Sequence, residues 1–153
     1  MNKIKIFIEL TRLNKPIGFM LLFWPCLWGL ALAFHQTGEF RLFINYIILF
    51  FLGSVLMRSA GCIFNDIADK DFDKKVNRTK NRPISSGRIS TQESFVYIIL
   101  LCLVAFIILI QFNFLTIILG LLSIPFVFSY PYMKRLTYWP QFFLGLTFNW
   151  AFC

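Results

Sequence analysis

The feature that most constrains the fold of this chain is a series of long apolar stretches. Four of them cover residues 16–34, 42–64, 94–110 and 114–132. Each approaches the roughly 20 residues that a helix needs to cross a bilayer. Backbone polar groups find no water in the hydrocarbon core, so stretches of this kind form helices there. We therefore predict an all-α protein, a multi-span transmembrane helical bundle in a lipid bilayer.

The last segment, residues 140–153, is also apolar but has only about 14 residues, fewer than a span needs. It ends without a polar flank, so we expect four complete spans plus the start of a fifth. On this interpretation residues 1–153 are the N-terminal part of a single transmembrane domain whose C-terminal half is missing. A separately encoded C-terminal half is then an expected partner. A noncatalytic truncated membrane subunit is the alternative.

The basic residues indicate an orientation rather than nucleic-acid binding. The net charge is +8, but no nucleic-acid-binding pattern accompanies it, so we expect no nucleic-acid partner. Lysines and arginines gather before residue 16, within the polar connection 65–91, and in the loop 133–139. Such residues favour the cytoplasmic side. We expect these three segments to face the cytoplasm of a bacterial inner membrane, with the mitochondrial inner membrane as the alternative.

All four aspartates of the chain lie within eight residues, directly after Asn65: Asp66, Asp69, Asp71 and Asp73. If the second span continues as a helix through this run, Asn65, Asp69 and Asp73 lie within about 80° of one another. Asp66 falls just beyond them, and Asp71 points away, toward solvent or a lysine. Mg²⁺ is commonly held by one or two carboxylates plus substrate phosphates. The run predicts a Mg²⁺ site, with a solvated acidic helix end as the alternative.

Basic residues near this run are candidate contacts for an anionic ligand. Arg58 lies in the second apolar stretch, two helical turns before Asn65 and on nearly the same face. It either contacts a phosphate, steadies Asp66, or extends to the membrane interface. Lys134 and Arg135 lie at the same predicted membrane face. They either bind diphosphate oxygens or only set the topology.

A capping pattern marks the start of the third span. Ser90 is followed three residues later by Glu93, immediately before an apolar run. This spacing is typical of a capping box, in which each residue satisfies a backbone N–H of the other. We therefore expect the third helix to begin here.

The order Asn65-Asp66-xx-Asp69-xxx-Asp73 resembles the first aspartate-rich motif, NDxxDxxxD, of the UbiA-type intramembrane prenyltransferases. Further stretches resemble the 4-hydroxybenzoate polyprenyltransferase branch of that family. They are residues 12–18 with Trp24-Pro25 and Trp28, residues 77–87, and residues 130–135 with 140–141 and 144–145. The resemblance implies a bundle of about nine spans that binds a polyprenyl diphosphate through Mg²⁺. It implies transfer of the polyprenyl group to the ring of 4-hydroxybenzoate, on the route to ubiquinone.

The resemblance also implies residue roles. Asp66, Asp69 and Asp73 take the catalytic positions, and Asn65, Asp69 and Asp73 the metal positions. By the resemblance, the candidate diphosphate ligands are Arg78, Arg82, Lys134 and Arg135. Arg58 is added to them because of its place in the second apolar stretch. The family's second aspartate motif is not among these residues, so we expect the 153 residues alone to be inactive. Other acceptors remain alternatives: haem B, homogentisate, a naphthoate or a lipid headgroup.

Overall fold

The fold is built from helices that follow the apolar stretches. The computed structural model describes residues 3–136, 139, 141–142 and 145, without the side chains of residues 130–132 and 134–136. Its helices are α1 (Lys3–Thr11), α2 (Ile17–Thr37), α3 (Phe40–Ala68), α4 (Lys70–Asp73), α5 (Thr91–Leu109) and α6 (Phe114–Leu136). No strand occurs in the part of the chain described, which confirms the all-α prediction.

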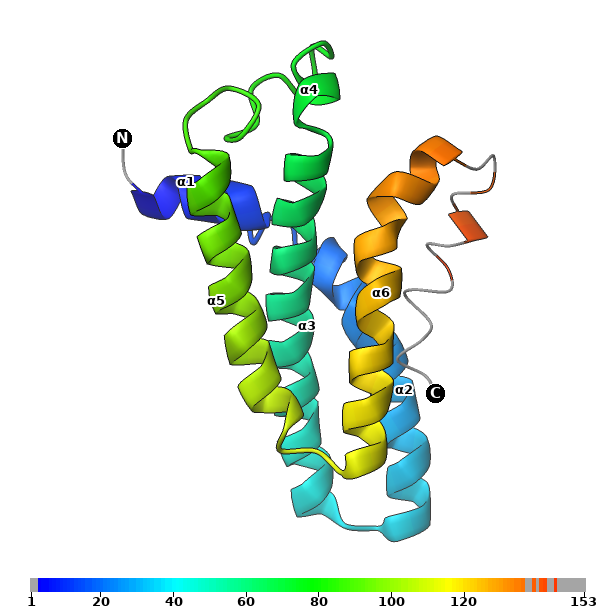
Figure 1. Cartoon of the computed structure of the whole chain (residues 1–153). Coiled ribbons are helices and arrows are strands. Elements are labelled where there is room, and N and C mark those ends of the chain that lie inside the picture. Colours follow the sequence, from blue (N-terminus) through cyan, green and yellow to red (C-terminus); the bar gives the residue numbers. More distant parts are fainter. Residues whose placement is uncertain (1–2, 137–138, 140, 143–144, 146–153) are drawn as a thin grey trace.

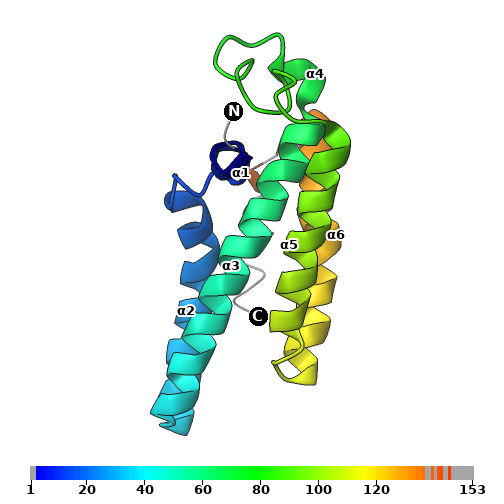
Figure 2. The ribbon, with the colours of Figure 1, turned by 90° about the vertical axis from the view of Figure 1, so that its left-hand side faces the viewer.

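Helices α2, α3, α5 and α6 run up and down as a bundle, and α3 lies at its centre (Figure 1). Helix α3 packs against both α2 and α5, and more sparsely against α6. Helix α1 lies across the bundle near the end where α3 finishes, as Figure 2 also shows. The connection from α4 to α5 covers this same end. The turns from α2 to α3 and from α5 to α6 lie at the opposite end.

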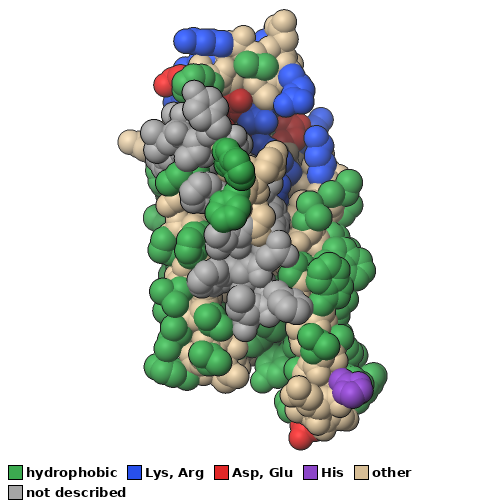
Figure 3. All heavy atoms as spheres, turned by 90° about the vertical axis from the view of Figure 1, so that its right-hand side faces the viewer, with side chains coloured by type: hydrophobic (Ala, Val, Ile, Leu, Met, Phe, Trp, Pro, Cys, Tyr) green, Lys and Arg blue, Asp and Glu red, His purple; other side chains and the backbone are tan. Residues whose placement is uncertain are grey.

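Three of the four predicted spans are long and apolar enough to cross a membrane: α2, α3 and α5. Helix α6 covers the fourth predicted span, and its described apolar part, Phe114–Ser129, is shorter than these three. Many large hydrophobic side chains are exposed along the helices. On the face seen in Figure 3 they lie along the length of the bundle, while lysines and arginines gather at one end. The expected start of a fifth helix at 140–153 falls mostly outside the described residues.

Local capping determines where two of the spans begin or end. Gly38 follows α2 in the left-handed region, with φ of 67°, and donates its N–H to the Phe34 carbonyl. Glycine tolerates this conformation because it has no Cβ. At the start of α5, the Ser90 side chain accepts from the Glu93 N–H, and the Glu93 carboxylate accepts from the Ser90 N–H. The predicted capping box is therefore confirmed.

A small apolar core joins the elements at the charged end. Leu10 of α1, Ile63 of α3 and Ile98 of α5 pack with Ile84 and Ile89 of the connection between α4 and α5. Leu10, Ile63 and Ile84 are each at most 1% exposed. Burial of these side chains stabilises the fold of a connection that would otherwise be a polar loop, at about 1.5–3 kcal/mol for each large aliphatic group.

Candidate functional site: a basic cleft beside two buried aspartates

The second span does not continue as one helix through Asp73, which was the condition for placing the aspartates on one face. Helix α3 ends at Ala68, and Asp69, with φ of −91° and ψ of 4°, separates it from the single turn of α4. The break is mild, because the Asp69 N–H still donates to the Asn65 carbonyl at 2.9 Å. The angles calculated for one straight helix therefore do not give the relative positions of aspartates on either side of the break.

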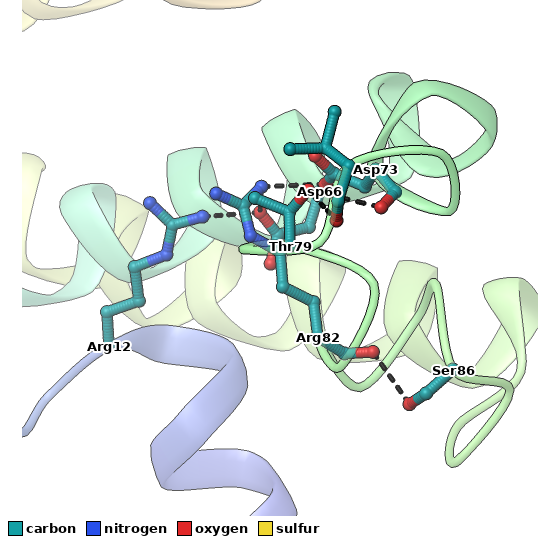
Figure 4. Close-up of polar contacts among 7 residues, drawn as sticks. Arg12, Asp66, Asp73, Thr79, Arg82 and Ser86 are labelled. Atoms are coloured by element: carbon teal, nitrogen blue, oxygen red, sulfur yellow. Dashed lines mark hydrogen bonds and ion pairs between the residues drawn. The ribbon is translucent and has the colours of Figure 1, made fainter.

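Asp66 is the most enclosed of the four aspartates, with 1% of its surface exposed. Its Oδ1 accepts from Arg12 Nη2 at 2.5 Å and from Arg82 Nη1 at 3.1 Å. Arg12 follows α1, and Arg82 belongs to the connection before α5, so three separate segments meet here (Figure 4). A buried carboxylate needs partners of this kind, because an unpaired charge is strongly disfavoured away from water.

Arg82 joins Asp66 to Asp73. The same Nη1 atom that reaches Asp66 donates to Asp73 Oδ2 at 2.7 Å (Figure 4). The side chain of Asp73 is 10% exposed, and that of Arg82 is 26% exposed. Arg12, Asp66, Asp73 and Arg82 are referred to below as the Arg–Asp cluster. Its two carboxylates converge on one cationic atom, although they come from different helices.

Bonds within the connection hold Arg82 in this position. The buried Thr79 hydroxyl donates to the Asp73 carbonyl at 3.1 Å, which folds the chain back over α4. The Ser86 hydroxyl donates to the Arg82 carbonyl at 2.7 Å. Gly87 then takes a φ of 73°, a conformation that favours glycine. The polar connection therefore builds a folded cap over the end of α3.

A cleft of about 890 Å³ opens beside the Arg–Asp cluster. Six basic side chains and two acidic ones are among those that line it: Arg12, Lys15, Arg58, Arg78, Arg82, Arg88, Glu9 and Asp66. Such a surplus of guanidinium groups favours an anion that carries several oxygens. The cleft lies between α1, the start of α2, the end of α3 and the connection to α5.

Three of the predicted diphosphate ligands line this cleft: Arg58, Arg78 and Arg82. Arg58 is half-buried on α3 and shares the cleft with Asp66. It lies close to Gly18 of α2, where a Cβ would come within 2.8 Å of Arg58 Nε. A residue without a side chain at this point leaves room for the guanidinium against the helix backbone. The side chains of Lys134 and Arg135, by contrast, lie outside the described residues.

The predicted acidic ligands divide into two groups. Asp66 lines the cleft and Asp73 is tied to it through Arg82, whereas Asn65 and Asp69 are half-buried and are not among the lining residues. The Asp71 side chain is 86% exposed and pairs with Lys74 at 3.5 Å. The expectation that Asp71 points to solvent or a lysine is confirmed.

Two arginines that line the cleft, Arg12 and Arg88, have partners that were not predicted from the sequence. Arg12 was assigned only to the topology and to a resemblance stretch, yet it binds Asp66, 54 positions away. Arg88 donates to Glu9 at 2.8 Å and to the Asn81 carbonyl at 2.6 Å, which connects α1 to the α4–α5 connection. No local pattern joins residues so far apart. The sequence offers one signal for Arg12, namely that it is a charged residue at the end of a short amphipathic helix.

The donor set suits a hard divalent cation in part. The oxygens of Asp66 and Asp73 both contact Arg82 Nη1, so two carboxylates already converge around positive charge. No three His, Cys, Asp or Glu side chains group as metal ligands within the described residues. Mg²⁺ usually keeps water and substrate phosphates as its other ligands, so two carboxylates fit its ordinary coordination.

Comparison with known proteins places these features in a family context. The UbiA prenyltransferase family pattern matches residues 22–153. The 4-hydroxybenzoate octaprenyltransferase of Vibrio atlanticus (strain LGP32) is 46% identical over 150 residues, 98% of this chain and 51% of that protein. The mitochondrial 4-hydroxybenzoate polyprenyltransferase of Caenorhabditis elegans is 47% identical over 148 residues, 97% of this chain and 41% of that protein. The chain thus spans about half the length of the curated relatives it matches.

A solved structure shares the fold. The apo structure of a UbiA homolog from Aeropyrum pernix K1 matches with a TM-score of 0.74 and 27% sequence identity. The match covers 88% of this chain and 46% of that one. The helical arrangement of this chain is therefore similar to that of a known UbiA homolog.

Proposed function

Because the chain belongs to the UbiA prenyltransferase family, we propose that it serves transfer of a polyprenyl group from a polyprenyl diphosphate to the ring of 4-hydroxybenzoate, in ubiquinone biosynthesis. The observation that carries this proposal is the basic cleft beside Asp66, at the charged end of an apolar bundle. The names of the relatives from Vibrio atlanticus and Caenorhabditis elegans favour 4-hydroxybenzoate as the acceptor.

The proposal treats residues 1–153 as the N-terminal part of a single prenyltransferase domain. The motifs follow one another in the family's order, and the chain covers about half of its curated relatives. The activity is therefore proposed for a protein in which this part is completed, for instance by a separately encoded C-terminal half. The N-terminus and the aspartate connection are placed on the cytoplasmic side of a bacterial inner membrane. Support comes from α1 and that connection lying at one end of the bundle.

In this proposal the arginines of the cleft bind the diphosphate of the donor. Arg58, Arg78 and Arg82 line the cleft, and a guanidinium group offers paired N–H donors to phosphate oxygens. Lys134 and Arg135 are proposed to add charge from the end of α6. The polyprenyl chain is apolar and fits the hydrophobic sides of the bundle.

Asn65, Asp66, Asp69 and Asp73 are the residues that would hold Mg²⁺. When bound, a divalent ion neutralises the negative charge that grows on the leaving diphosphate. Without such charge, the carboxylates would repel a diphosphate. The two convergent carboxylates of Asp66 and Asp73 support this assignment.

The proposed chemical step transfers the polyprenyl group from the diphosphate to the acceptor ring. The bond between the allylic carbon and the diphosphate oxygen breaks, and the pair of electrons leaves with the diphosphate. The acceptor ring, at the carbon ortho to its hydroxyl, forms the new carbon–carbon bond and then loses its proton. Water would trap the allylic cation, so an apolar surrounding protects the reaction.

The test measures prenylated 4-hydroxybenzoate formed by membranes that contain the complete protein, with and without Mg²⁺. We expect product only with Mg²⁺, and a loss on the order of a hundredfold or more for Asp69→Ala and for Asp73→Ala. Asp71→Ala is the matched control, because its side chain is 86% exposed and paired only at the surface. Undiminished product from the Asp69 and Asp73 variants would refute the metal assignment. Homogentisate, a naphthoate or haem B as the preferred acceptor would refute the assigned acceptor.

A further inference from the structure

We propose that buried Asp66 withholds Arg12 and Arg82 from an anion in the cleft until positive charge from another source balances its carboxylate. This inference rests on the proposed function and concerns the regulation of the same cleft.

Asp66 is buried and is paired with two arginines. Its surface is 1% exposed, and both arginines donate to one of its oxygens. Removing the partner of a buried carboxylate is strongly unfavourable, since the charge is then uncompensated away from water. A free anion that draws Arg12 and Arg82 away must therefore overcome this loss.

The two arginines lie where they could contact either Asp66 or an anion in the cleft. Arg12 and Arg82 both line the cleft, and their side chains are 30% and 26% exposed. Each guanidinium thus lies between the buried acid and the open space, and Figure 4 shows both directed toward Asp66. Turning toward an anion in the cleft requires side-chain rotation. Once positive charge from another source balances Asp66 and Asp73, this rotation leaves neither carboxylate unpaired.

The backbone of Arg12 lies in the left-handed region. Its φ is 56°, the single positive value outside glycine among the described residues. A side chain rarely adopts this left-handed conformation without compensation. The ion pair with Asp66 offers such compensation, and it holds the Arg12 side chain in the lining of the cleft, just after α1. The cluster thus combines a strained residue with a buried acid.

The experiment titrates inorganic pyrophosphate into the full chain, purified in detergent, by calorimetry with and without Mg²⁺. For the unmodified protein we expect binding at least tenfold tighter with Mg²⁺. Arg12→Gln is expected to weaken binding about tenfold with Mg²⁺ and to change it little without Mg²⁺, because Asp66 already withholds Arg12 in that condition. Arg41→Gln, an exposed arginine at the start of α3, is the matched control and should have no effect in either condition.

A second set of variants separates the withheld arginine from simple charge repulsion. Asp66→Asn removes the negative charge, so we expect pyrophosphate to bind about tenfold tighter without Mg²⁺. In that background, Arg12→Gln should now weaken metal-free binding about tenfold, although it has little effect when Asp66 is present. Circular dichroism checks that Asp66→Asn folds. The comparison between Arg12→Gln and the unmodified protein does not depend on that variant.

The outcomes distinguish this inference from the proposed function. Equal pyrophosphate affinity with and without Mg²⁺ would overturn the inference and leave the diphosphate site standing. The same weakening by Arg12→Gln in both conditions would also overturn it, since the arginine would then be equally available. Absence of pyrophosphate binding even with Mg²⁺ would instead overturn the diphosphate site itself.

Discussion

The two ends of the bundle are built in different ways. At the charged end, residues 74–90 join α4 to α5 and fold over the end of α3 through ion pairs and buried isoleucines. At the opposite end, Gly38 and Glu39 join α2 to α3, and residues 110–113 join α5 to α6. Short turns suffice where helices only reverse direction. A long folded connection is found where charged side chains from several segments meet.

The difference concerns the kind of interaction as well as the length. The charged end depends on contacts between residues distant in sequence, such as Arg12 with Asp66 and Arg88 with Glu9. The opposite end depends on local bonds, such as the Gly38 N–H to the Phe34 carbonyl. Substitutions in the Arg–Asp cluster should therefore affect both stability and anion binding, and substitutions at the opposite end stability alone.

The largest effect is expected from Asp66→Ala, which breaks the charged end. The variant leaves Arg12 and Arg82 side by side without their shared acid, and we expect a loss of about 2–3 kcal/mol in the free energy of unfolding. Unfolding in SDS followed by circular dichroism measures the loss. Limited proteolysis should cut within residues 74–90 sooner than in the unmodified protein. A variant as stable and as protease-resistant as Asp71→Ala would contradict this account.

A smaller effect is expected at the opposite end, from Gly38→Ala. The φ of 67° places the new Cβ in an unfavourable conformation, although no atom lies within 4 Å of it. We expect a loss of about 1–2 kcal/mol from backbone strain alone. The same SDS unfolding assay measures it, and pyrophosphate binding with Mg²⁺ should stay unchanged. A change in that binding would show that the two ends are coupled.

Ser90→Ala tests a local bond at the charged end. The substitution removes the oxygen that accepts from the Glu93 N–H at 3.1 Å. Loss of a helix N-cap typically lowers stability by about 1 kcal/mol. Ser90→Asp keeps an acceptor at the same position and should restore most of that stability, as judged by thermal unfolding in detergent. Equal loss in both variants would mean that the cap is not the source of the effect.

The smallest effect is expected from Lys74→Ala. Lys74 pairs with Asp71 at 3.5 Å, and both side chains are more than half exposed. Exposed ion pairs of this kind contribute less than about 0.5 kcal/mol, because water and salt screen them. Thermal unfolding should show no measurable shift at physiological salt. A clear loss of stability would place this pair with the Arg–Asp cluster instead of with the solvent-exposed surface.

Much of the fold could be predicted from the sequence because its signals are local. The apolar stretches predicted the courses of α2, α3 and α5, and the Ser90–Glu93 spacing predicted the start of α5. The exposed position of Asp71 also followed from helical periodicity. The position of the break at Asp69 did not follow, since several aspartates with low helix propensity lie within a few residues and the sequence does not single out one of them.

The candidate site was only partly predictable. The residues Arg58, Arg78 and Arg82 were named in advance, and they line one cleft with Asp66. The partner of Asp66 that lies furthest away, Arg12, was not named in that role, because its contact depends on where α1 lies across the bundle. Arg12 and Asp66 are 54 positions apart, so no local sequence pattern indicates that they pair.

The amino-acid sequence by itself determined which segments are apolar helices, where their caps lie and where the acids and bases gather, because each of these depends on neighbours within a few positions. The tertiary structure alone decided which base meets which acid. Arg12 and Arg82 reach Asp66 only because α1 and the connection before α5 both pack against the end of α3. Ion pairing follows distance in space, and that distance is set once the chain has folded back on itself.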